Sequence, residues 1–164
     1  FREGKVIGSG GPCPVRVEKE LTIGAAGGPV PIRYTLTNRS DVALPVRFGV
    51  EFGFSLQAGD TFDRYYIIPG QEERPRLGSV GEVRNLQKIS LVEEWVGLKI
   101  TLSMDRPADF WRFPIETISN SEGGFERVYQ SSVVVIVQQT ELQPGKPWSF
   151  ELTLTVEHPE AGEF

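Results

Sequence analysis

The segment from Leu44 to Leu56 constrains the fold more than any other part of this 164-residue chain. Apolar side chains occupy every second position of it: Leu44, Val46, Phe48, Val50, Phe52, Phe54 and Leu56. At 100° per residue these positions would scatter around a helix axis, whereas in a strand they share one face. The segment is therefore predicted to be a long strand with one apolar face. Gly49 and Gly53 fall on the opposite face, which indicates a bend or a close neighbour in a large curved sheet.

Other segments repeat the strand pattern. They are residues 15–23, 32–37, 96–104, 111–117 and 148–156, together with Val133–Val137, a β-branched run that suits a strand buried on both faces. No window of eleven residues shows the i, i+3, i+4, i+7 spacing of a helix. The predicted fold class is all-β, a large antiparallel β-sandwich with little or no helix.

The expected domain is the sandwich of residues 15–157. Residues 1–14 are rich in Gly and are expected to be a linker or an edge segment, and residues 158–164 a flexible C-terminal tail. Residues 57–87 carry Gly or Pro at short intervals and are expected to be mainly loop, with a length typical of binding loops. Asp105-Arg106-Pro107 is expected to turn the chain, and residues 119–127 to form a polar corner.

Composition and charge exclude several classes of function. The net charge of −5 and the absence of a basic block argue against a nucleic-acid partner. No stretch is apolar over the 18 residues needed to cross a membrane, so no membrane partner is expected. Cys13 and His158 are the only residues of their types, too few for a zinc site. No catalytic residue, metal or cofactor is predicted, because the carboxylates that are close in sequence are explained by turns and solvated surface.

One stretch, Trp111–Gln130, reads WRFPIETISNSEGGFERVYQ. It resembles a segment of the C-terminal β domain of glycoside hydrolase family 57 enzymes, the α-amylase and 4-α-glucanotransferase group. Residues 34–38 and 48–52 look like a strand pair of that domain, so the resemblance covers residues 15–157. It implies a galactose-mutarotase-like supersandwich whose partner is the catalytic domain of its own parent chain. The family's catalytic carboxylates lie in an N-terminal (β/α) barrel, and none can be placed on this chain.

Several residues in these segments are expected to be structural. Glu51 needs Arg or backbone donors if a second sheet covers it, and Glu122 lies where free backbone N–H groups are plentiful. The full set is Glu51, Ser121, Glu122, Gly123, Gly124, Glu126 and Gln130.

Aromatic side chains are the candidates for sugar contact, since a flat ring can stack on the apolar face of a sugar. Six were compared: Trp95, Trp111, Trp148, Tyr65, Tyr66 and Tyr129. Trp148 shares the parity of core residues, whereas Trp95 falls opposite the apolar set and is the better exposed platform. Tyr65 and Tyr66 point opposite ways on an extended chain, so at most one should face the core. The predicted carbohydrate-binding residues are Trp95, Tyr65, Tyr66 and Trp111, with Glu93, Arg64 and Asp63 as polar partners.

Three functions remain open. The first is a non-catalytic accessory C-terminal domain of an α-glucan-processing enzyme, with α-glucan oligosaccharide as a possible ligand. The second is an autonomous carbohydrate-active enzyme of mutarotase or lyase type, which the single histidine disfavours because such chemistry needs an acid and a base on either side of the ring. The third is a structural sandwich without ligand.

Overall fold

The computed structural model describes residues 1–8, 10–25, 27–121, 124–160 and 164, and the regular structure of this part is entirely β. The strands are β1 (Arg2–Gly8), β2 (Gly11–Leu21), β3 (Val30–Asn38), β4 (Leu44–Phe54), β5 (Arg64–Ile67), β6 (Gly81–Glu93), β7 (Leu98–Ser121), β8 (Gly124–Leu142) and β9 (Pro147–Glu157). All the strand pairs are antiparallel, which confirms the predicted fold class. Within the described residues there is no helix of the length and apolarity that a membrane span requires.

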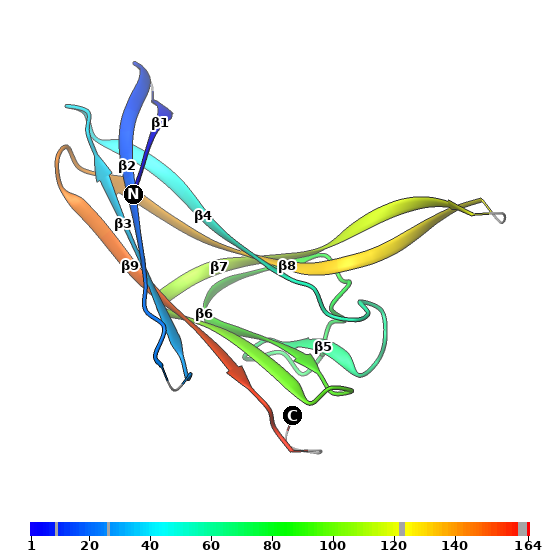
Figure 1. The fold of residues 1–164 in the computed structure, drawn as a ribbon. Coiled ribbons are helices and arrows are strands. Elements are labelled where there is room, and N and C mark those ends of the chain that lie inside the picture. The colour runs from blue at the N-terminus through cyan, green and yellow to red at the C-terminus, as the bar shows by residue number, and fades with distance from the viewer. Residues whose placement is uncertain (9, 26, 122–123, 161–163) are drawn as a thin grey trace.

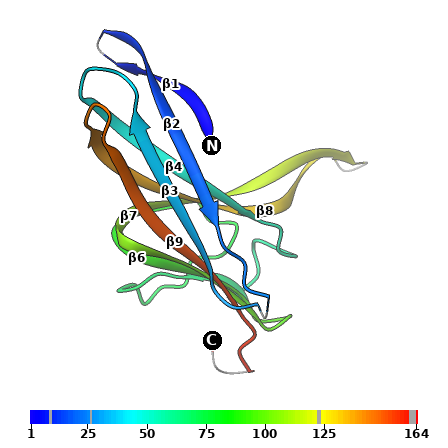
Figure 2. The same cartoon turned by 60° about the vertical axis from the view of Figure 1, so that its left-hand side comes forward.

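The strands form two packed layers that share β7. One layer follows the order β1-β2-β3-β9 and joins β7, β6 and β5; the other is made by β4, β8 and the second half of β7. Figures 1 and 2 show β4 and β8 crossing behind the β2-β3-β9 layer. Residues 2–8, for which the sequence left a linker or an edge segment open, form β1 at the edge of the first layer.

Strand β7 changes partner halfway along its length. Its residues Lys99–Met104 pair with β9, and its residues Asp109–Ser121 pair with β8. The prediction of a turn at Asp105-Arg106-Pro107 is wrong, because these residues continue strand β7. Between the partners Leu86↔Ala108 and Lys88↔Ser103 the register with β6 shifts, so the strand bends there instead of turning back. A proline is tolerated at such an irregularity because no ladder hydrogen bond depends on its missing N–H.

The core lies between β4 and the β3–β9 pair. The rings of Tyr34 and Phe150 stack with centroids 5.5 Å apart, and Phe48 of β4 packs on them at 5.6 and 6.0 Å. These contacts confirm the apolar face predicted for residues 44–56. On the other face, a Cβ on Gly49 would make a tight contact of 3.3 Å with Val135 Cγ1, whereas a Cβ on Gly53 would meet nothing within 4 Å.

Residues 57–87 contain more strand than expected. Four of them form β5, and β6 begins at Gly81. The sequence hides β5 because Arg64, Tyr65 and Tyr66 are all buried, so no exposed position reveals a period of two. The remaining segment, residues 68–80, covers one end of the body and is called the covering loop below.

The expected polar corner at residues 119–127 is the far end of a long hairpin. Strands β7 and β8 continue pairing from Glu116↔Tyr129 to Ser121↔Gly124, well beyond the sandwich. Figure 1 shows this hairpin projecting from the body as an arm. We call the paired residues 115–121 and 124–131 the arm.

Candidate functional site

A polar cleft of 520 Å³ opens where the arm leaves the body. The covering loop and residues 59–60 form one wall, and the root of the arm forms the other. Its charged and aromatic lining consists of Asp60, Glu73, Arg76, Arg112, Glu116 and Tyr129. The volume lies within the range of small-molecule sites in proteins.

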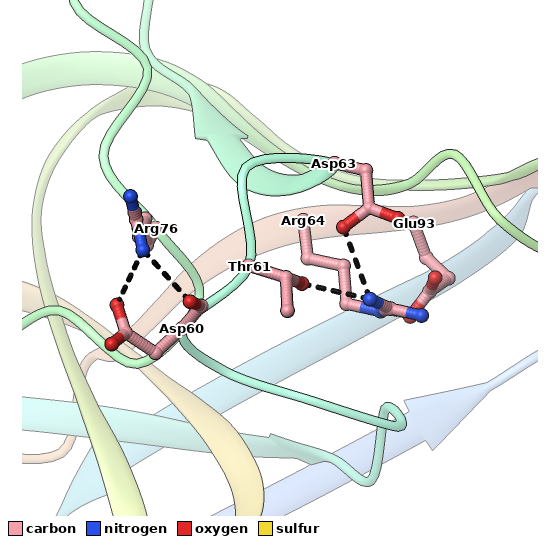
Figure 3. A network of polar contacts seen from close by, with 6 residues as sticks. All are labelled: Asp60, Thr61, Asp63, Arg64, Arg76 and Glu93. Carbon is pink, nitrogen blue, oxygen red and sulfur yellow. Dashed lines mark hydrogen bonds and ion pairs between the residues drawn. The ribbon is translucent and has the colours of Figure 1, made fainter.

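Ion pairs hold the chain segments beside this cleft in place, as Figure 3 shows. The Nε of Arg64 donates to the Glu93 carboxylate, and its Nη1 donates to Thr61 and Asp63 at 2.7 and 3.0 Å. Glu93 is 1% exposed, so this pair joins β5 to β6 inside the protein. The hydrogen bond from Thr61 is the main cause that lowers the pKa of the Asp63 carboxyl.

A second pair bridges the cleft wall itself. Nη1 of Arg76 donates to the Asp60 carboxylate at 2.9 Å and to the Asp60 carbonyl oxygen at 2.7 Å. Because Asp60 is exposed, this pair contributes little to stability but fixes where both side chains lie.

Glycines allow the walls to approach each other. The N–H of Gly78 donates to the carbonyl oxygen of Gly59 at 2.6 Å. A Cβ on Gly59 would lie 2.5 Å from the ring of Tyr129, and a Cβ on Gly81 would lie 2.5 Å from both terminal nitrogens of Arg112. The sequence marks these glycines only as loop breakers, whereas here they make room for two side chains of the cleft.

Arg112 supplies a second guanidinium to the cleft, beside that of Arg76. Its Nε donates to Ser79 Oγ at 3.1 Å, and the group lies 5.7 Å from the ring centroid of Tyr66. Burial lowers the pKa of Arg112, although a guanidinium keeps its charge in proteins. Among the described residues no carboxylate forms an ion pair with Arg112, so its terminal nitrogens are not committed to an ion pair.

Tyr129 is fixed from behind. Its hydroxyl shares a 2.7 Å hydrogen bond with Ser132, whose Oγ donates to the carbonyl oxygen of Leu77. Burial raises the pKa of Tyr129, which keeps the phenol neutral. Next to it, Glu116 forms an ion pair with Arg127 across the arm.

The lining therefore presents donors and acceptors in near balance. Asp60, Glu73 and Glu116 supply carboxylate oxygens, while Arg76 and Arg112 supply N–H groups. Such a set can bind the hydroxyl groups of a polar, uncharged ligand. Across the described part of the chain, no group of three His, Cys, Asp or Glu side chains is arranged to hold a metal ion.

The structure places the predicted aromatic residues differently from one another. Trp95 is 75% exposed, as predicted, but it lies in the turn between β6 and β7, where the parity of a strand does not apply. Trp111 is partly covered, and Arg47 lies 6.0 Å from its ring centroid. Trp148 packs against the core, as predicted.

Tyr65 and Tyr66 are both buried, but only Tyr66 belongs to the main core, which agrees with the expectation that at most one of them faces it. Tyr66 points into the main core. Tyr65 points to the other side, where Arg74 covers its ring at 4.7 Å and its hydroxyl donates to Glu94 at 2.6 Å. Neither ring offers a free face to a sugar in this structure, because the covering loop packs over β5.

The polar partners expected beside these rings are also committed. Arg64 donates to both Glu93 and Asp63 in the network of Figure 3, and the three are not grouped around Trp95. The sequence shows which residues are charged but not that two of them meet inside the protein.

The residues expected to be structural lie mostly at the surface. Glu51 is exposed on the outer face of β4, and Glu126 is exposed on the arm. Gln130 Nε2 donates to Thr117 Oγ1 at 3.2 Å across the arm, and Gly124 has a φ of 110°, which glycine adopts readily. Glu122, Gly123 and the side chain of Ser121 lie outside the described residues.

The architecture defines the class of protein: an antiparallel sandwich of the galactose-mutarotase-like type. A galactose mutarotase-like protein from Lactobacillus casei superposes with a TM-score of 0.52 over 96% of this chain and 74% of that chain, at 13% identity. An aldose epimerase homologue from Caenorhabditis elegans superposes with a TM-score of 0.63 over 95% of this chain and 64% of that chain, at 9% identity. At these identities the likeness shows the fold.

The sequence profile of one family narrows this class. The family described as alpha-amylase/4-alpha-glucanotransferase, C-terminal, matches residues 1–152, and the chain belongs to it. Alpha-amylase 1 of Dictyoglomus thermophilum is 33% identical over 124 residues, which are 73% of this chain and 17% of that protein. The crystal structure of 4-alpha-glucanotransferase from Thermococcus litoralis superposes with a TM-score of 0.68 over 94% of this chain and 20% of that chain, at 21% identity. The resemblance noted in residues 111–130 is thus confirmed, and the chain corresponds to about a fifth of each of these two proteins.

Proposed function

We propose that this chain is a non-catalytic accessory domain of an α-glucan-processing enzyme, and that it packs against the catalytic domain of its own parent chain. The observation that carries the proposal is the family match over residues 1–152, combined with the small share of the two relatives that the match covers. A domain of this kind acts by bracing the catalytic domain and by holding substrate near it.

The arm is the surface that we propose for the contact with the catalytic domain. Ile118 and Phe125 are 72% and 84% exposed, and their partners in the register, Arg127 and Asn120, place both on the same face of the arm. Large apolar side chains on a two-stranded hairpin gain nothing from exposure to water, so they favour an apolar partner. The catalytic domain of the parent is the partner proposed here.

The cleft favours a binding role over the autonomous-enzyme alternative. His158 lies near the end of the chain, where its Nδ1 is 3.1 Å from the carbonyl oxygen of Gly97, far from the cleft lining. Arg76 and Arg127 already pair with Asp60 and Glu116, so both carboxylates already serve as ion-pair partners. The isolated chain is expected to leave maltooligosaccharides unchanged over prolonged incubation, and turnover by a pure sample would contradict the proposal.

Exposed aromatic side chains extend the proposal to carbohydrate. Trp95 is the most exposed of the predicted platform residues, and Trp111 is half-covered beside Arg47. We propose Trp95 as a stacking platform for a glucan chain, with Trp111 as a second contact.

The docking proposal is tested by the double substitution Ile118→Ser/Phe125→Ser in the parent enzyme. Removing this apolar surface should lower the melting temperature of the parent while leaving that of the isolated chain almost unchanged, because both side chains are exposed in the chain alone. The matched control is Ile7→Ser/Ile23→Ser, which changes two similarly exposed apolar residues, one in β1 and one shortly after β2. Equal effects of the two double variants on the parent would overturn the docking surface.

A further inference from the structure

We propose that the cleft between the covering loop and the root of the arm binds a neutral sugar unit, with Arg112 as its main donor and Tyr129 as its apolar wall. This inference rests on the proposed role in an α-glucan-processing enzyme for the choice of sugar. It assigns the binding to residues other than the exposed platform at Trp95.

Arg112 has N–H donors that no ion pair of the described residues uses. Its guanidinium is half-buried against Gly81, is held by Ser79, and forms no ion pair with any described carboxylate. The carboxylate of Glu73 acts on this charge without forming an ion pair, so the burial of the guanidinium is only partly offset and a ligand that accepts from its N–H groups would be favoured. Arg112 is one of the residues that line the cleft.

The charges around the cleft are balanced. Asp60 and Glu116 pair with Arg76 and Arg127, which leaves Glu73 and Arg112, so no net charge favours a phosphate or carboxylate ligand. A neutral polyol suits the same walls, because each hydroxyl can accept from Arg112 or Arg76 and donate to Glu73, Asp60 or Glu116.

The ring of Tyr129 is held in a fixed position in the cleft. Tyr129 is packed against Gly59 and is fixed through Ser132 to the covering loop. A ring held in this way is an apolar surface that needs no ordering when a ligand arrives, which favours binding.

The cleft lies next to the face of the arm that is proposed to contact the catalytic domain. Glu116 and Tyr129 form a cross-strand pair on the same face of the arm as Ile118 and Phe125. If the arm contacts the catalytic domain through this face, the cleft opens beside the domain interface, where ligand sites are common. Figure 1 shows the covering loop and the root of the arm on the same side of the body.

The test is titration of maltotriose and maltoheptaose into the 164-residue chain, followed by calorimetry and by amide chemical shifts. Arg112→Gln should weaken binding about tenfold, since hydrogen bonds to a charged donor are lost. Gly81→Ala adds a methyl group where the flexible end of Arg112 lies, so it should weaken binding severalfold with a small change in melting temperature. The control is Arg33→Gln, which removes an exposed guanidinium paired with Glu151 in the other layer and should leave the affinity unchanged.

The outcomes separate this inference from the proposed function. Shifts centred on residues 59–60, 71–79 and 112–129 support the cleft. Shifts centred on Trp95, or affinities that Arg112→Gln and Gly81→Ala leave intact, overturn the cleft while the accessory role survives. No binding by the wild type at about 10 mM sugar, or tighter binding of inorganic phosphate than of maltotriose, also overturns it. Failure of the arm substitutions in the parent enzyme would instead count against the docking proposal alone.

Discussion

The two halves of strand β8 differ in what holds them in place. Residues 132–138 are almost entirely buried between the layers, whereas residues 124–128 in the arm are exposed on every side. Both halves pair antiparallel with β7, but only the body half also pairs with β4 along its other edge. The body is therefore stabilised by burial and by a second strand neighbour, whereas the arm contributes exposed surface that can contact a partner.

The loss of a large aromatic side chain should have a much larger effect on stability in the body than in the arm. Phe110→Ala in the body is expected to destabilise the chain by about 3–5 kcal/mol, because a fully buried ring leaves a cavity. Phe125→Ala in the arm should change the free energy of unfolding by less than about 0.5 kcal/mol. Urea unfolding of both variants measures the difference, and similar losses would show that the arm is packed in solution.

The next largest difference in stability is expected between the buried ion pair Arg64–Glu93 of the body and the exposed ion pair Arg127–Glu116 of the arm. Arg64→Met should cost about 3 kcal/mol, because it leaves the Glu93 carboxylate buried without its cation. Arg127→Met removes the exposed partner of Glu116 and should cost about 0–1 kcal/mol. In the double variant Arg64→Met/Glu93→Met most of the stability should return, and a double variant as unstable as the single one would argue against an unpaired charge as the cause.

The two buried tyrosines of β5, in the body, should make the stability of the chain decrease at alkaline pH. Burial raises the pKa of both Tyr65 and Tyr66 from 10.0 to about 12. The unfolded chain therefore loses these protons first, so the stabilisation is full below pH 10 and decreases as pH rises towards 12. Thermal unfolding at a series of pH values measures this decrease, which should be smaller in Tyr65→Phe/Tyr66→Phe. An unchanged pH dependence in that variant would contradict the assignment.

The sequence predicts the strands better than it predicts their connections. The alternation in residues 44–56 identifies β4 because one face is buried and the other is exposed. The same rule misses β5, where Arg64, Tyr65 and Tyr66 are all buried, and it misplaces a turn at residues 105–107, where β7 bends between two partners. A local pattern reports how the two faces of a strand differ, but not which strand lies beside it.

The cleft is formed by segments that are distant in the sequence, so the roles of Arg112 and Gly81 could not be predicted from local patterns. The exposure of Trp95 was predicted, although it comes from the turn between β6 and β7 and not from the alternation of a strand. Arg112 and Gly81 belong to neighbouring strands, paired in the register Gly81↔Arg112, and their contact depends on that register. The signal present in the sequence was a glycine at a strand start, which has several possible meanings.

The pairing of β3 with β9 has a consequence for the order in which the chain can fold. Partners such as Val30 and Leu154 lie at opposite ends of the sequence, so β3 keeps one open edge until the last strand has been synthesised. Contacts of this range make folding slow, and they leave strand edges uncovered in the meantime. On the ribosome, the β1-β2-β3 sheet therefore waits for β9, and a nascent chain halted before residue 147 would present this unpaired edge to chaperones or to other nascent chains.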